Sequence, residues 1–438
     1  MAIENQASRR ERIESNVNAC SSPSELRITD MRMAVVWSNY DYPLIRIDTN
    51  QGVYGLGEVR DAGHKENALQ FKSFLLGENP LNIDKILRSI RHFGGHGRQG
   101  GGYSGIELAL YDLIGKVYGV PCYQLLGGRY RDKVRIYADT PSPAEPTPEG
   151  YAERVKGRVE MGMTFCKFDL SLNVLAGVDG ALVGKPSAYD YDPDRRWTAR
   201  GTVVGTQLTD RGIERYVEIV AAVREAVGWD IPLCIDHLGD ITLNDAIRLG
   251  RALEPFGLAW IEDVLPWQDI EGNRLLTRAI EVPTLTGEDI YLLDGFKPLI
   301  DQRAVDIIQP DLLTAGGMLE TKRIADYAEV HNMPTVLHCA SSPIGYLANL
   351  HCAAAIPSLI ALENHALDLP FWKDLVTGLP DPWLEEGFIA VPEKPGLGVD
   401  LNLEGIEENL RFPGLFEPTE EWNTPKLGFW QPDKRWDK

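Results

Sequence analysis

Three acidic residues stand at equal intervals in the middle of the chain, and they limit its possible folds more than any other feature. Asp236 ends the run PLCID, Glu262 ends LAWIE and Glu288 ends PTLTGE, so each acid follows the previous one by 26 residues. Short apolar runs bounded by Pro, Gly or polar residues are typical of buried strands. The segment after the first acid, NDAIRLGRALEPFG, has apolar residues at helical spacing. This order predicts successive units of a parallel (β/α) barrel with an acid at each strand's end.

The same alternation continues on both sides of the three acids. From about residue 134 the pattern predicts eight strands, the number in a TIM-like barrel. They are VRIYAD, TFCKFDL, LCID, LAWIED, TLTGED, VDIIQPD, TVLHCA and LIALEN. We therefore expect an α/β fold in which residues 134–365 form a (β/α)8-type barrel. An insertion without helical period, 171–212, interrupts this pattern, and such long loops inside a compact domain are usually functional.

The residues before the barrel predict a separate α+β capping domain, 25–133. Its expected strands are MRMAVVW, YPLIRIDT and VYGLGEV, of which the first two form a hairpin through SNYD. A segment with seven glycines in fourteen residues, HFGGHGRQGGGYSG, predicts a loop that is mobile or closely approached by another segment. A well-marked helix follows it. We expect residues 1–24 to form a flexible tail and residues 366–438 to pack back and complete the cap.

Composition excludes few functions but weighs against two kinds of partner. The net charge of −20 disfavours nucleic acid and anionic membrane surfaces. No run approaches the roughly 20 apolar residues that span a bilayer. The six cysteines are scattered without a CxxC pair, and the N-terminal residues lack the apolar core of a secretory signal. Reduced cysteines in a cytoplasmic protein are therefore expected.

The three acids predict a metal site if the barrel brings them together. Carboxylates at one barrel mouth repel each other unless positive charge lies between them, and a hard divalent cation prefers such oxygen ligands. The alternative is that Asp236, Glu262 and Glu288 are solvated loop residues or helix N-caps. Their equal spacing favours the metal site.

Further chemical groups stand at the ends of the later strands. Asp311 ends IIQPD and His338 ends TVLH on the next strand. Because neighbouring strands end side by side, Asp311 could orient the imidazole and raise its proton affinity, which would make His338 a base. A purely structural histidine is the alternative reading.

Two more predicted strands, the second and the eighth, carry charged residues near their carboxyl ends. Glu363 ends the eighth strand, where it could contact a substrate oxygen or serve only as a polar cap. Lys167 lies on the second strand, and Asp169 shares its side because strand side chains alternate. Lys167 could bind a substrate carboxylate or act as a base with a lowered pKa. Alternatively, Lys167 and Asp169 form an ion pair without a chemical role.

From about residue 25 to 400 the chain resembles the enolase superfamily, in its mandelate racemase subgroup. The resemblance rests on YSGIELALYDLIGK and GVPCYQLLGG in the cap and on WIEDV, TGED, QPD, LHC and LEN at strand ends. It implies Asp236, Glu262 and Glu288 as metal ligands, with Mg²⁺ as the metal or Mn²⁺ in its place. It further implies Asp311 and His338 as the catalytic dyad and Glu363 as the eighth-strand glutamate. Enzymes of this superfamily use a Lys or His base and Mg²⁺ to stabilise an enediolate.

The chain departs from the racemase pattern on its second strand. The racemase has Lys-x-Lys there, whereas this chain has Lys167 and Asp169, so the second base of a racemase is missing. Some related dehydratases have a histidine two residues after the first metal ligand. Here that position is Leu238, and the histidine is His237, directly after Asp236. His237 is a candidate general acid, with a wall or supporting residue as the alternative.

Loops of the cap are expected to close over the barrel mouth and supply specificity. The residues in or near these loops that could contact substrate are Trp37, Asn39, Tyr40, His92, His96 and Tyr103. Their polar character suits a substrate with several hydroxyl groups.

Taken together, these features predict a metal-dependent lyase that dehydrates a sugar acid to a 2-keto-3-deoxy acid. His338 would remove the α-proton, and the β-hydroxyl would leave with help from His338 itself or from His237. An epimerase, racemase or lactone cycloisomerase is the alternative within the same class. A non-catalytic barrel that binds acid sugars is a more remote one. A homo-oligomer is expected, as is common for such enzymes.

Overall fold

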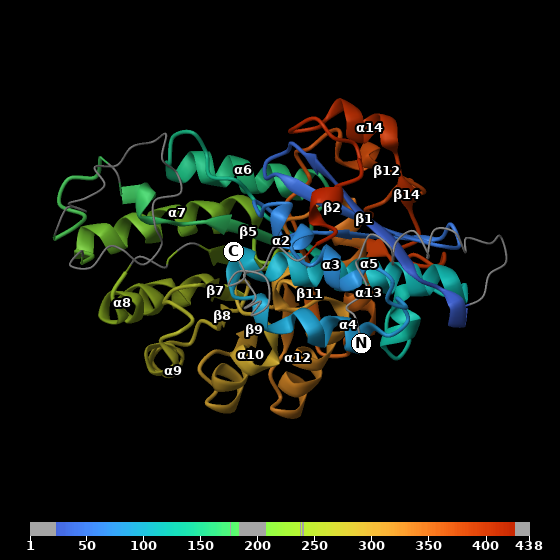
Figure 1. The fold of residues 1–438 in the computed structure, drawn as a ribbon. Coiled ribbons are helices and arrows are strands. Elements are labelled where there is room, and N and C mark those ends of the chain that lie inside the picture. The colour runs from blue at the N-terminus through green and yellow to red at the C-terminus, as the bar shows by residue number, and fades with distance from the viewer. Residues whose placement is uncertain (1–22, 176, 184–206, 237, 239–240, 425–438) are drawn as a thin grey trace, which may run out of the picture.

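The computed structural model describes residues 23–175, 177–183, 207–236, 238 and 241–424 (Figure 1). Eight parallel strands form a closed barrel, in which each strand pairs with the next and the last, β11, pairs with the first, β4. All eight lie where the sequence predicted them. The strands are β4 (Lys133–Ala138), β5 (Cys166–Asp169), β6 (Leu233–Asp236), β7 (Trp260–Glu262), β8 (Thr284–Thr286), β9 (Ile307–Ile308), β10 (Thr335–Leu337) and β11 (Leu359–Asn364).

Helices follow the first seven strands and cover the outside of the barrel. They are α6 (Pro148–Glu160), α7 (Asp210–Val227), α8 (Leu243–Leu253), α9 (Ile270–Ala279), α10 (Leu292–Asp301), α11 (Leu312–Ala315), α12 (Met318–Val330) and α13 (Pro343–Ala355). Helix α8 shows how the sequence sets these elements. Thr242 caps its start by accepting a hydrogen bond from the backbone N–H of Asp245, and its predicted apolar face is buried against the barrel.

One apolar layer, here called the apolar plug, fills the inside of the barrel. Each strand, or the residue just before it, contributes one buried side chain to this cluster. Its members are Tyr137, Phe165, Cys234, Trp260, Leu285, Ile307, Val336 and Ala361. Because strand side chains alternate between two faces, residues two positions further along each strand point into the barrel again. They form the next layer, closer to the strands' carboxyl ends.

The cap is an antiparallel sheet of β1 (Ile28–Val36), β2 (Tyr42–Thr49) and β3 (Tyr54–Glu58), with α5 (Gly101–Tyr118) packed against it. The predicted hairpin of the first two strands is confirmed. Strand β3 and helix α5 approach so closely that a Cβ on Gly57 would lie 2.1 Å from the carbonyl oxygen of Gly105. Three short helices complete the cap before α5. They are α2 (Glu66–Leu69), α3 (Lys72–Leu75) and α4 (Ile83–Ile90).

The glycine-rich segment is only partly a loop, because α5 already begins at Gly101. The expectation of a loop through residue 105 is therefore wrong for its last five residues. The expected close approach is confirmed, since a Cβ on Gly102 would lie 1.9 Å from the carbonyl oxygen of Asn67. Glycine lowers helix propensity, but close packing against the cap outweighs that preference here.

Two buried glutamates of the cap bind the starts of two barrel helices. Glu58 accepts hydrogen bonds from the backbone N–H groups of Ser342 and Gly345, at the start of α13. Glu107 accepts them from Met318 and Leu319, at the start of α12. Helix starts expose unpaired N–H groups and attract negative charge. Burial still outweighs these bonds and raises the pKa of Glu58 to about 7 and that of Glu107 to about 8.

The C-terminal residues run back along the cap, so that the red end of the chain lies beside the blue strands in Figure 1. The backbone N–H of Arg411 donates to the carbonyl oxygen of Val35, and that of Trp37 donates to Asn409. The elements in this segment are η7 (Trp372–Leu375), β12 (Val376–Thr377), β13 (Phe388–Ala390), β14 (Asp400–Leu401), α14 (Leu403–Glu408) and η8 (Glu420–Trp422). Strand β13 adds to the barrel by pairing antiparallel with β4.

Two expected segments fall largely outside the described residues. Of the tail 1–24, only its last two residues are described, and they belong to a 3-10 helix, η1 (Pro23–Glu25). Of the insertion 171–212, residues 176 and 184–206 lie outside, while η5 (Leu172–Leu175) and the first turn of α7 lie inside.

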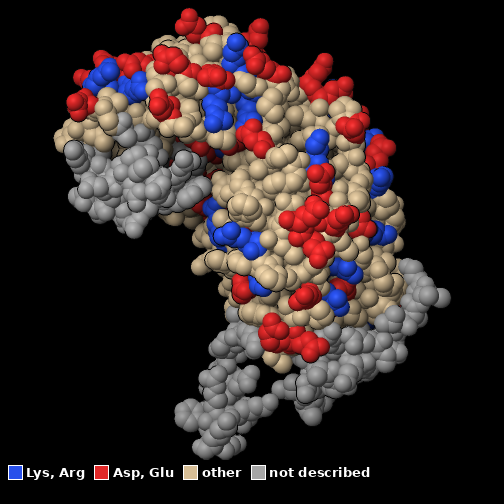
Figure 2. All heavy atoms as spheres, turned by 90° about the horizontal axis from the view of Figure 1, so that it is seen from above, with Lys and Arg blue, Asp and Glu red and all other residues tan. Residues whose placement is uncertain are grey.

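Among the described helices, none combines the length and apolar character needed to cross a membrane. Figure 2 shows acidic and basic side chains intermixed over one face of the molecule.

Candidate active site

A layer of polar and charged residues, here called the charged layer, lies next to the apolar plug. Each member stands two residues after a member of the plug, and all are buried. They are Asp139, Lys167, Asp236, Glu262, Gln309, His338 and Glu363. On β8 the corresponding residue is Gly287, whose φ of +143° turns the chain, so that Glu288 reaches the layer instead.

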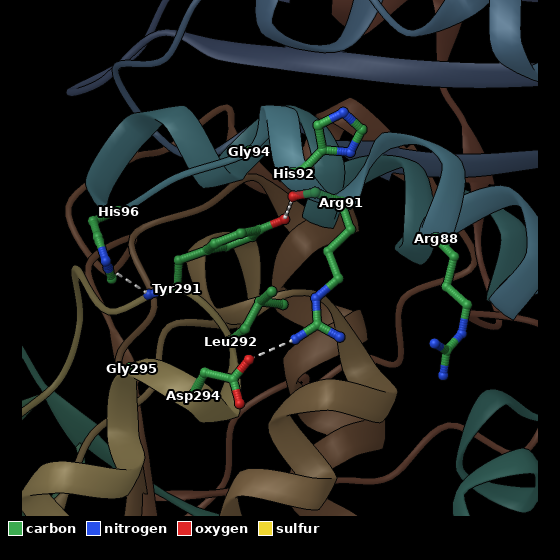
Figure 3. A pocket seen from close by; sticks show the side chains of 9 residues that line it. All are labelled: Arg88, Arg91, His92, Gly94, His96, Tyr291, Leu292, Asp294 and Gly295. Atoms are coloured by element: carbon green, nitrogen blue, oxygen red, sulfur yellow. Dashed lines mark hydrogen bonds and ion pairs between the residues drawn. The ribbon is translucent and has the colours of Figure 1, made fainter.

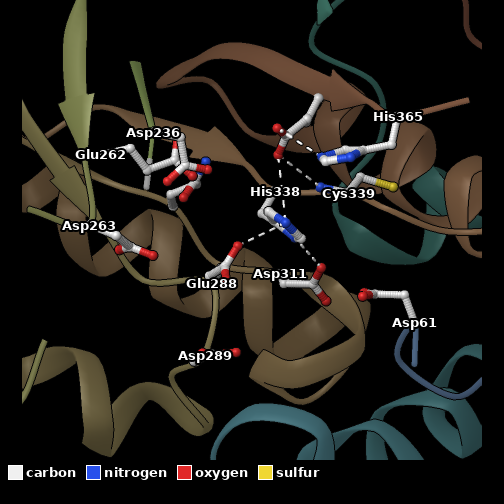
Figure 4. A network of polar contacts seen from close by, with 12 residues as sticks. Asp61, Asp236, Glu262, Asp263, Glu288, Asp289, Asp311, His338, Cys339 and His365 are labelled. Atoms are coloured by element: carbon white, nitrogen blue, oxygen red, sulfur yellow. Dashed lines mark hydrogen bonds and ion pairs between the residues drawn. The ribbon is translucent and has the colours of Figure 1, made fainter. Parts of the chain in front are cut away.

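His338 is the most constrained residue of this layer. Its Nδ1 lies 2.6 Å from Oδ2 of Asp311, and its Nε2 lies 2.9 Å from Oε2 of Glu288 (Figure 4). Burial lowers the pKa of His338, but the charges of Glu288 and Glu363 and the bond to Asp311 outweigh burial and raise it well above its ordinary value. The predicted contact between Asp311 and His338 is therefore present.

Asp311 is itself held in place by the chain that follows it. It caps α11, and its Oδ1 accepts hydrogen bonds from the backbone N–H groups of Leu313, at 2.7 Å, and Thr314, at 3.1 Å. The second carboxylate oxygen remains for the imidazole. A carboxylate fixed in this way sets both the orientation and the tautomer of His338.

Lys167 lies among acids contributed by other strands. Its Nζ is 2.9 Å from Asp236 and 3.4 Å from Glu262, and it forms a closer ion pair with Glu363. Burial lowers the pKa of Lys167, but these three acids outweigh it and raise the pKa well above its ordinary value. The alternative of a base with a lowered pKa is therefore wrong. The alternative pair with Asp169 is also wrong, because Lys167 points to the neighbouring strands.

The three acids predicted to hold a metal ion are buried and stand at neighbouring strand ends, but they do not converge on one point. Among the described residues, their ligand atoms do not form a group within 4.8 Å. The reason is charge: Lys167 draws Asp236 and Glu262 to itself, while Glu288 turns to His338. Burial and the neighbouring Asp236 raise the pKa of Glu262, as expected where carboxylates crowd together in a buried site. A buried donor set made only of carboxylates fits a hard divalent cation.

A different group of residues has its potential metal-ligand atoms close together. The ligand atoms of His338, Glu363 and His365 lie within 4.8 Å of one another. His365 was not predicted from the sequence, although it follows Glu363 by two residues and so shares its side of the strand. Its Nδ1 lies 3.3 Å from Asp139, and its Nε2 lies 3.1 Å from Glu363.

The cap also contributes residues that the sequence did not single out. Arg60, fully buried just after β3, donates hydrogen bonds to Asp61, to the carbonyl oxygen of Glu288 and to Thr314. Its Nε lies 3.7 Å from Asp311. The only available signal was a charged pair, VRD, directly after a buried strand. Arg60 therefore places positive charge between the dyad and one of the three acids.

Of the other residues predicted from the sequence, some lie near the charged layer and the others do not. Tyr40 lies near the site, since its ring is 6.4 Å from that of His365. Asp169 pairs in register with Asp236 at the strand ends. His237 lies outside the described residues. Asn39 serves the cap itself, because its Oδ1 accepts a hydrogen bond from the hydroxyl of Tyr42.

Four residues expected in the cap loops are not brought to the charged layer. Trp37, just after β1, is 61% exposed at the surface, and its backbone N–H donates to the carbonyl oxygen of Asn409. Tyr103 is buried in the cap core, where it packs edge-on against Tyr291. His92 and His96 line a separate pocket of about 630 Å³ between the cap and α10 (Figure 3).

Two protein families match the chain. The description "Mandelate racemase / muconate lactonizing enzyme, N-terminal domain" matches residues 17–127, and "Enolase C-terminal domain-like" matches residues 151–405. These ranges correspond to the cap and to most of the barrel.

Several relatives are similar over most of their length. The D-xylonate dehydratase of Haloferax volcanii is 38% identical, with 88% of this chain and 89% of the relative covered. The D-gluconate dehydratase of Thermoproteus tenax is 27% identical, with 90% and 75% covered. A solved structure of a mandelate racemase/muconate lactonizing enzyme-like protein from Rubrobacter xylanophilus superimposes with a TM-score of 0.77 at 33% identity. That match covers 89% of this chain and 99% of the other.

Proposed function

Because the chain belongs to the mandelate racemase / muconate lactonizing enzyme family of the enolase superfamily, we propose that it is a metal-dependent hydro-lyase that dehydrates a sugar acid. The product is a 2-keto-3-deoxy acid and water. The observation that carries this proposal is the imidazole of His338, fixed by Asp311 and facing a set of buried acids.

Asp236, Glu262 and Glu288 are the proposed metal ligands, and Mg²⁺ is the proposed metal, with Mn²⁺ as a substitute. A divalent cation held there would stabilise the second negative charge that develops on a substrate carboxylate when its α-proton leaves. The protein's own part is to keep three carboxylates buried and to hold Lys167 beside two of them. Glu363, Asp169 and Tyr40 are proposed to contact the substrate.

His338 is the proposed base at the α-carbon. Asp311 holds its Nδ1, so the other ring nitrogen is directed to the interior of the barrel mouth. Glu288 lies against that nitrogen and is one of the groups that raise the pKa of His338. Glu288 would turn its carboxylate away from the ring if it held a metal ion, and that nitrogen would then face the substrate.

The structure also bears on the rival reactions of this superfamily. Racemisation by two bases needs a second group with a free electron pair on the opposite side of the substrate. The second base of the racemase corresponds to Asp169 in this chain, and the nearby amine of Lys167 is paired with three acids. We therefore favour dehydration over racemisation or epimerisation.

The names of the relatives suggest the substrate class. Proteins of similar sequence act on D-xylonate, D-gluconate and D-mannonate, and the relative with 38% identity acts on the five-carbon acid. We propose D-xylonate as the first substrate to test, with the six-carbon aldonates next.

The test is to incubate the protein and Mg²⁺ with each aldonate and to measure keto-acid formation with semicarbazide. Keto acid from at least one aldonate is expected, and removal of metal with EDTA should abolish it. A parallel reaction in deuterated water separates the rival reactions, because an epimerase returns deuterated substrate without keto acid. That second outcome, or no turnover of any aldonate, would overturn the proposal.

The setting of the enzyme is part of the same proposal. We propose a cytoplasmic homo-oligomer whose partner is the small-molecule sugar acid, and not nucleic acid or a membrane. The net charge of −20 supports the last part of this proposal, because it repels nucleic acid and anionic lipid. We also propose that the capping domain spans residues 25–133 and the barrel 134–365.

A further inference from the structure

A second aspartate–histidine pair lies beside the proposed catalytic dyad. His365 follows β11, and its Nδ1 lies 3.3 Å from Oδ2 of Asp139, which follows β4. Strands β11 and β4 are neighbours, because they close the barrel. The pair thus repeats the arrangement of His338 and Asp311, which stand on the neighbouring strands β10 and β9.

Both imidazoles face Glu363. Their ring centroids are 5.8 Å apart, and one nitrogen of each ring lies with a carboxylate oxygen of Glu363 in a group of atoms within 4.8 Å of one another. Glu363 stands between them, 3.8 Å from Nε2 of His338 and 3.1 Å from Nε2 of His365.

The polar atoms between the rings are paired by charge. Nε2 of His365 and Oε1 of Glu363 are both buried and lie 3.1 Å apart as an ion pair, without the geometry of a hydrogen bond, and the same oxygen also pairs with Lys167. A substrate hydroxyl that reached this pair could donate to the glutamate and accept from the histidine.

From this geometry we propose that His365, oriented by Asp139, is the catalytic acid that protonates the departing β-hydroxyl of the sugar acid. This inference rests on the proposed dehydratase function. His338 takes the α-proton, the electron pair of that C–H bond forms the new carbon–carbon double bond, and the β C–O bond breaks. His365 gives its proton to the leaving oxygen, which departs as water. The resulting enol then becomes the 2-keto-3-deoxy acid by moving its hydroxyl proton to the β-carbon through the two imidazoles, so each ring regains its starting state.

The spacing of the two rings suits one ring as the base at the α-carbon and the other as the acid at the β-hydroxyl. Hydrogen-bonding reach is about 2.6–3.2 Å, so nitrogens less than 4.8 Å apart can address an α-hydrogen and a hydroxyl on adjacent carbons. Two nitrogens this close together would act on one face of a substrate, which predicts elimination of hydrogen and hydroxyl from the same face. Other nearby groups suit the role less. Lys167 is bound to three acids, and burial raises the pKa of Tyr40, which makes it a weaker acid.

Mutation of His365 to Asn tests the proposal with two readouts on one substrate. Keto-acid formation should fall by at least about 10²-fold, whereas α-proton exchange in deuterated water, which needs His338 only, should stay within about threefold of wild type. A 3-deoxy-3-fluoro analogue should restore elimination, because fluoride leaves without needing a proton. His338→Asn should lose both exchange and elimination. His351→Gln, which removes a buried histidine outside the site, should lose neither.

Each other outcome overturns the proposal. Keto-acid formation within about threefold of wild type in His365→Asn would show that another group is the acid. Loss of exchange together with elimination would show that His365 only supports the site. If His365→Asn does not fold, His365→Gln and Asp139→Asn are scored by the same readouts. A wild-type protein that exchanges the α-proton but forms no keto acid would instead refute the dehydratase function, and the acid role with it.

Discussion

The guanidinium of Arg60, which reaches the barrel from the cap, donates a 2.7 Å hydrogen bond to the backbone carbonyl of Glu288. The same side chain approaches Asp311 to 3.7 Å and is completely buried. One residue of the cap thus holds both a proposed metal ligand and the partner of the proposed base. The position of the cap is therefore coupled to the geometry of the charged layer.

Replacing Arg60 with Met should destabilise the protein by about 3–5 kcal/mol, because the change leaves buried acids without their cation. Urea unfolding measures this loss, and kcat should fall on the order of 10²-fold. Arg98→Met is the matched control, since Arg98 bonds the same Asp61 but is 38% exposed. It should cost less than about 1 kcal/mol. Equal losses in the two variants would refute the special role of Arg60.

Replacing Asp311 with Asn should keep the fold and lower kcat by about 10³–10⁴-fold, because the amide no longer fixes the tautomer of His338. KM should change little, since Asp311 acts through His338. Asp245→Asn serves as the control, because Asp245 is also a buried acid that accepts a backbone hydrogen bond but lies on α8, outside the site. A loss confined to KM would contradict the proposed dyad.

Replacing Lys167 with Met should make stability depend more strongly on divalent metal. The variant leaves Asp236, Glu262 and Glu363 without the ammonium that now lies among them, so it should unfold at lower temperature in EDTA. Added Mg²⁺ should raise its melting temperature by more than it raises that of wild type.

The control for this prediction is Lys116→Met, which breaks a similar pair with buried Asp112 in the cap. Its response to Mg²⁺ should equal that of wild type. A melting temperature of the Lys167 variant that does not respond to Mg²⁺ would argue against a metal site at these acids.

Acid should destabilise the protein partly through His351, whose pKa is lowered to about 4 because burial disfavours the charged ring. In the unfolded chain the pKa returns to about 6.5. Between these values the unfolded state binds a proton that the folded state does not, so stability falls as the pH falls. The loss should total about 3 kcal/mol by pH 4.

His351→Gln removes this titration, so its stability should fall less than that of wild type between pH 7 and about pH 4. Urea unfolding at a series of pH values measures the difference. Parallel curves for the two proteins would show that His351 does not contribute.

Much of the barrel follows from local sequence. Each strand is a short apolar run that ends in a polar residue, and a buried barrel interior makes that pattern obligatory. The alternation of side chains also explains why acids and histidines recur two residues after the apolar plug. The equal spacing of Asp236, Glu262 and Glu288 is partly coincidental, because the third acid reaches the layer only through the turn at Gly287.

The errors lie where a residue's partner is distant in the chain. The sequence suggested Trp37, His96 and Tyr103 as contacts with the substrate, whereas Trp37 lies at the surface, Tyr103 in the cap core and His96 in the pocket beside α10. The charged pair VRD did not reveal the role of Arg60, since the barrel residues that it bonds, Glu288 and Thr314, stand more than two hundred positions away.

The amino-acid sequence alone determined the strands, their order and the chemical character of each strand end, because alternation and apolar patterning act over a few residues. Only the tertiary structure decided how the charges pair. Lys167 lies among the acids instead of acting as a base, Glu288 turns to His338, and His365 finds Asp139 across the closure of the barrel. Such pairings depend on distances between strand ends across the barrel, and no local rule of sequence contains those distances.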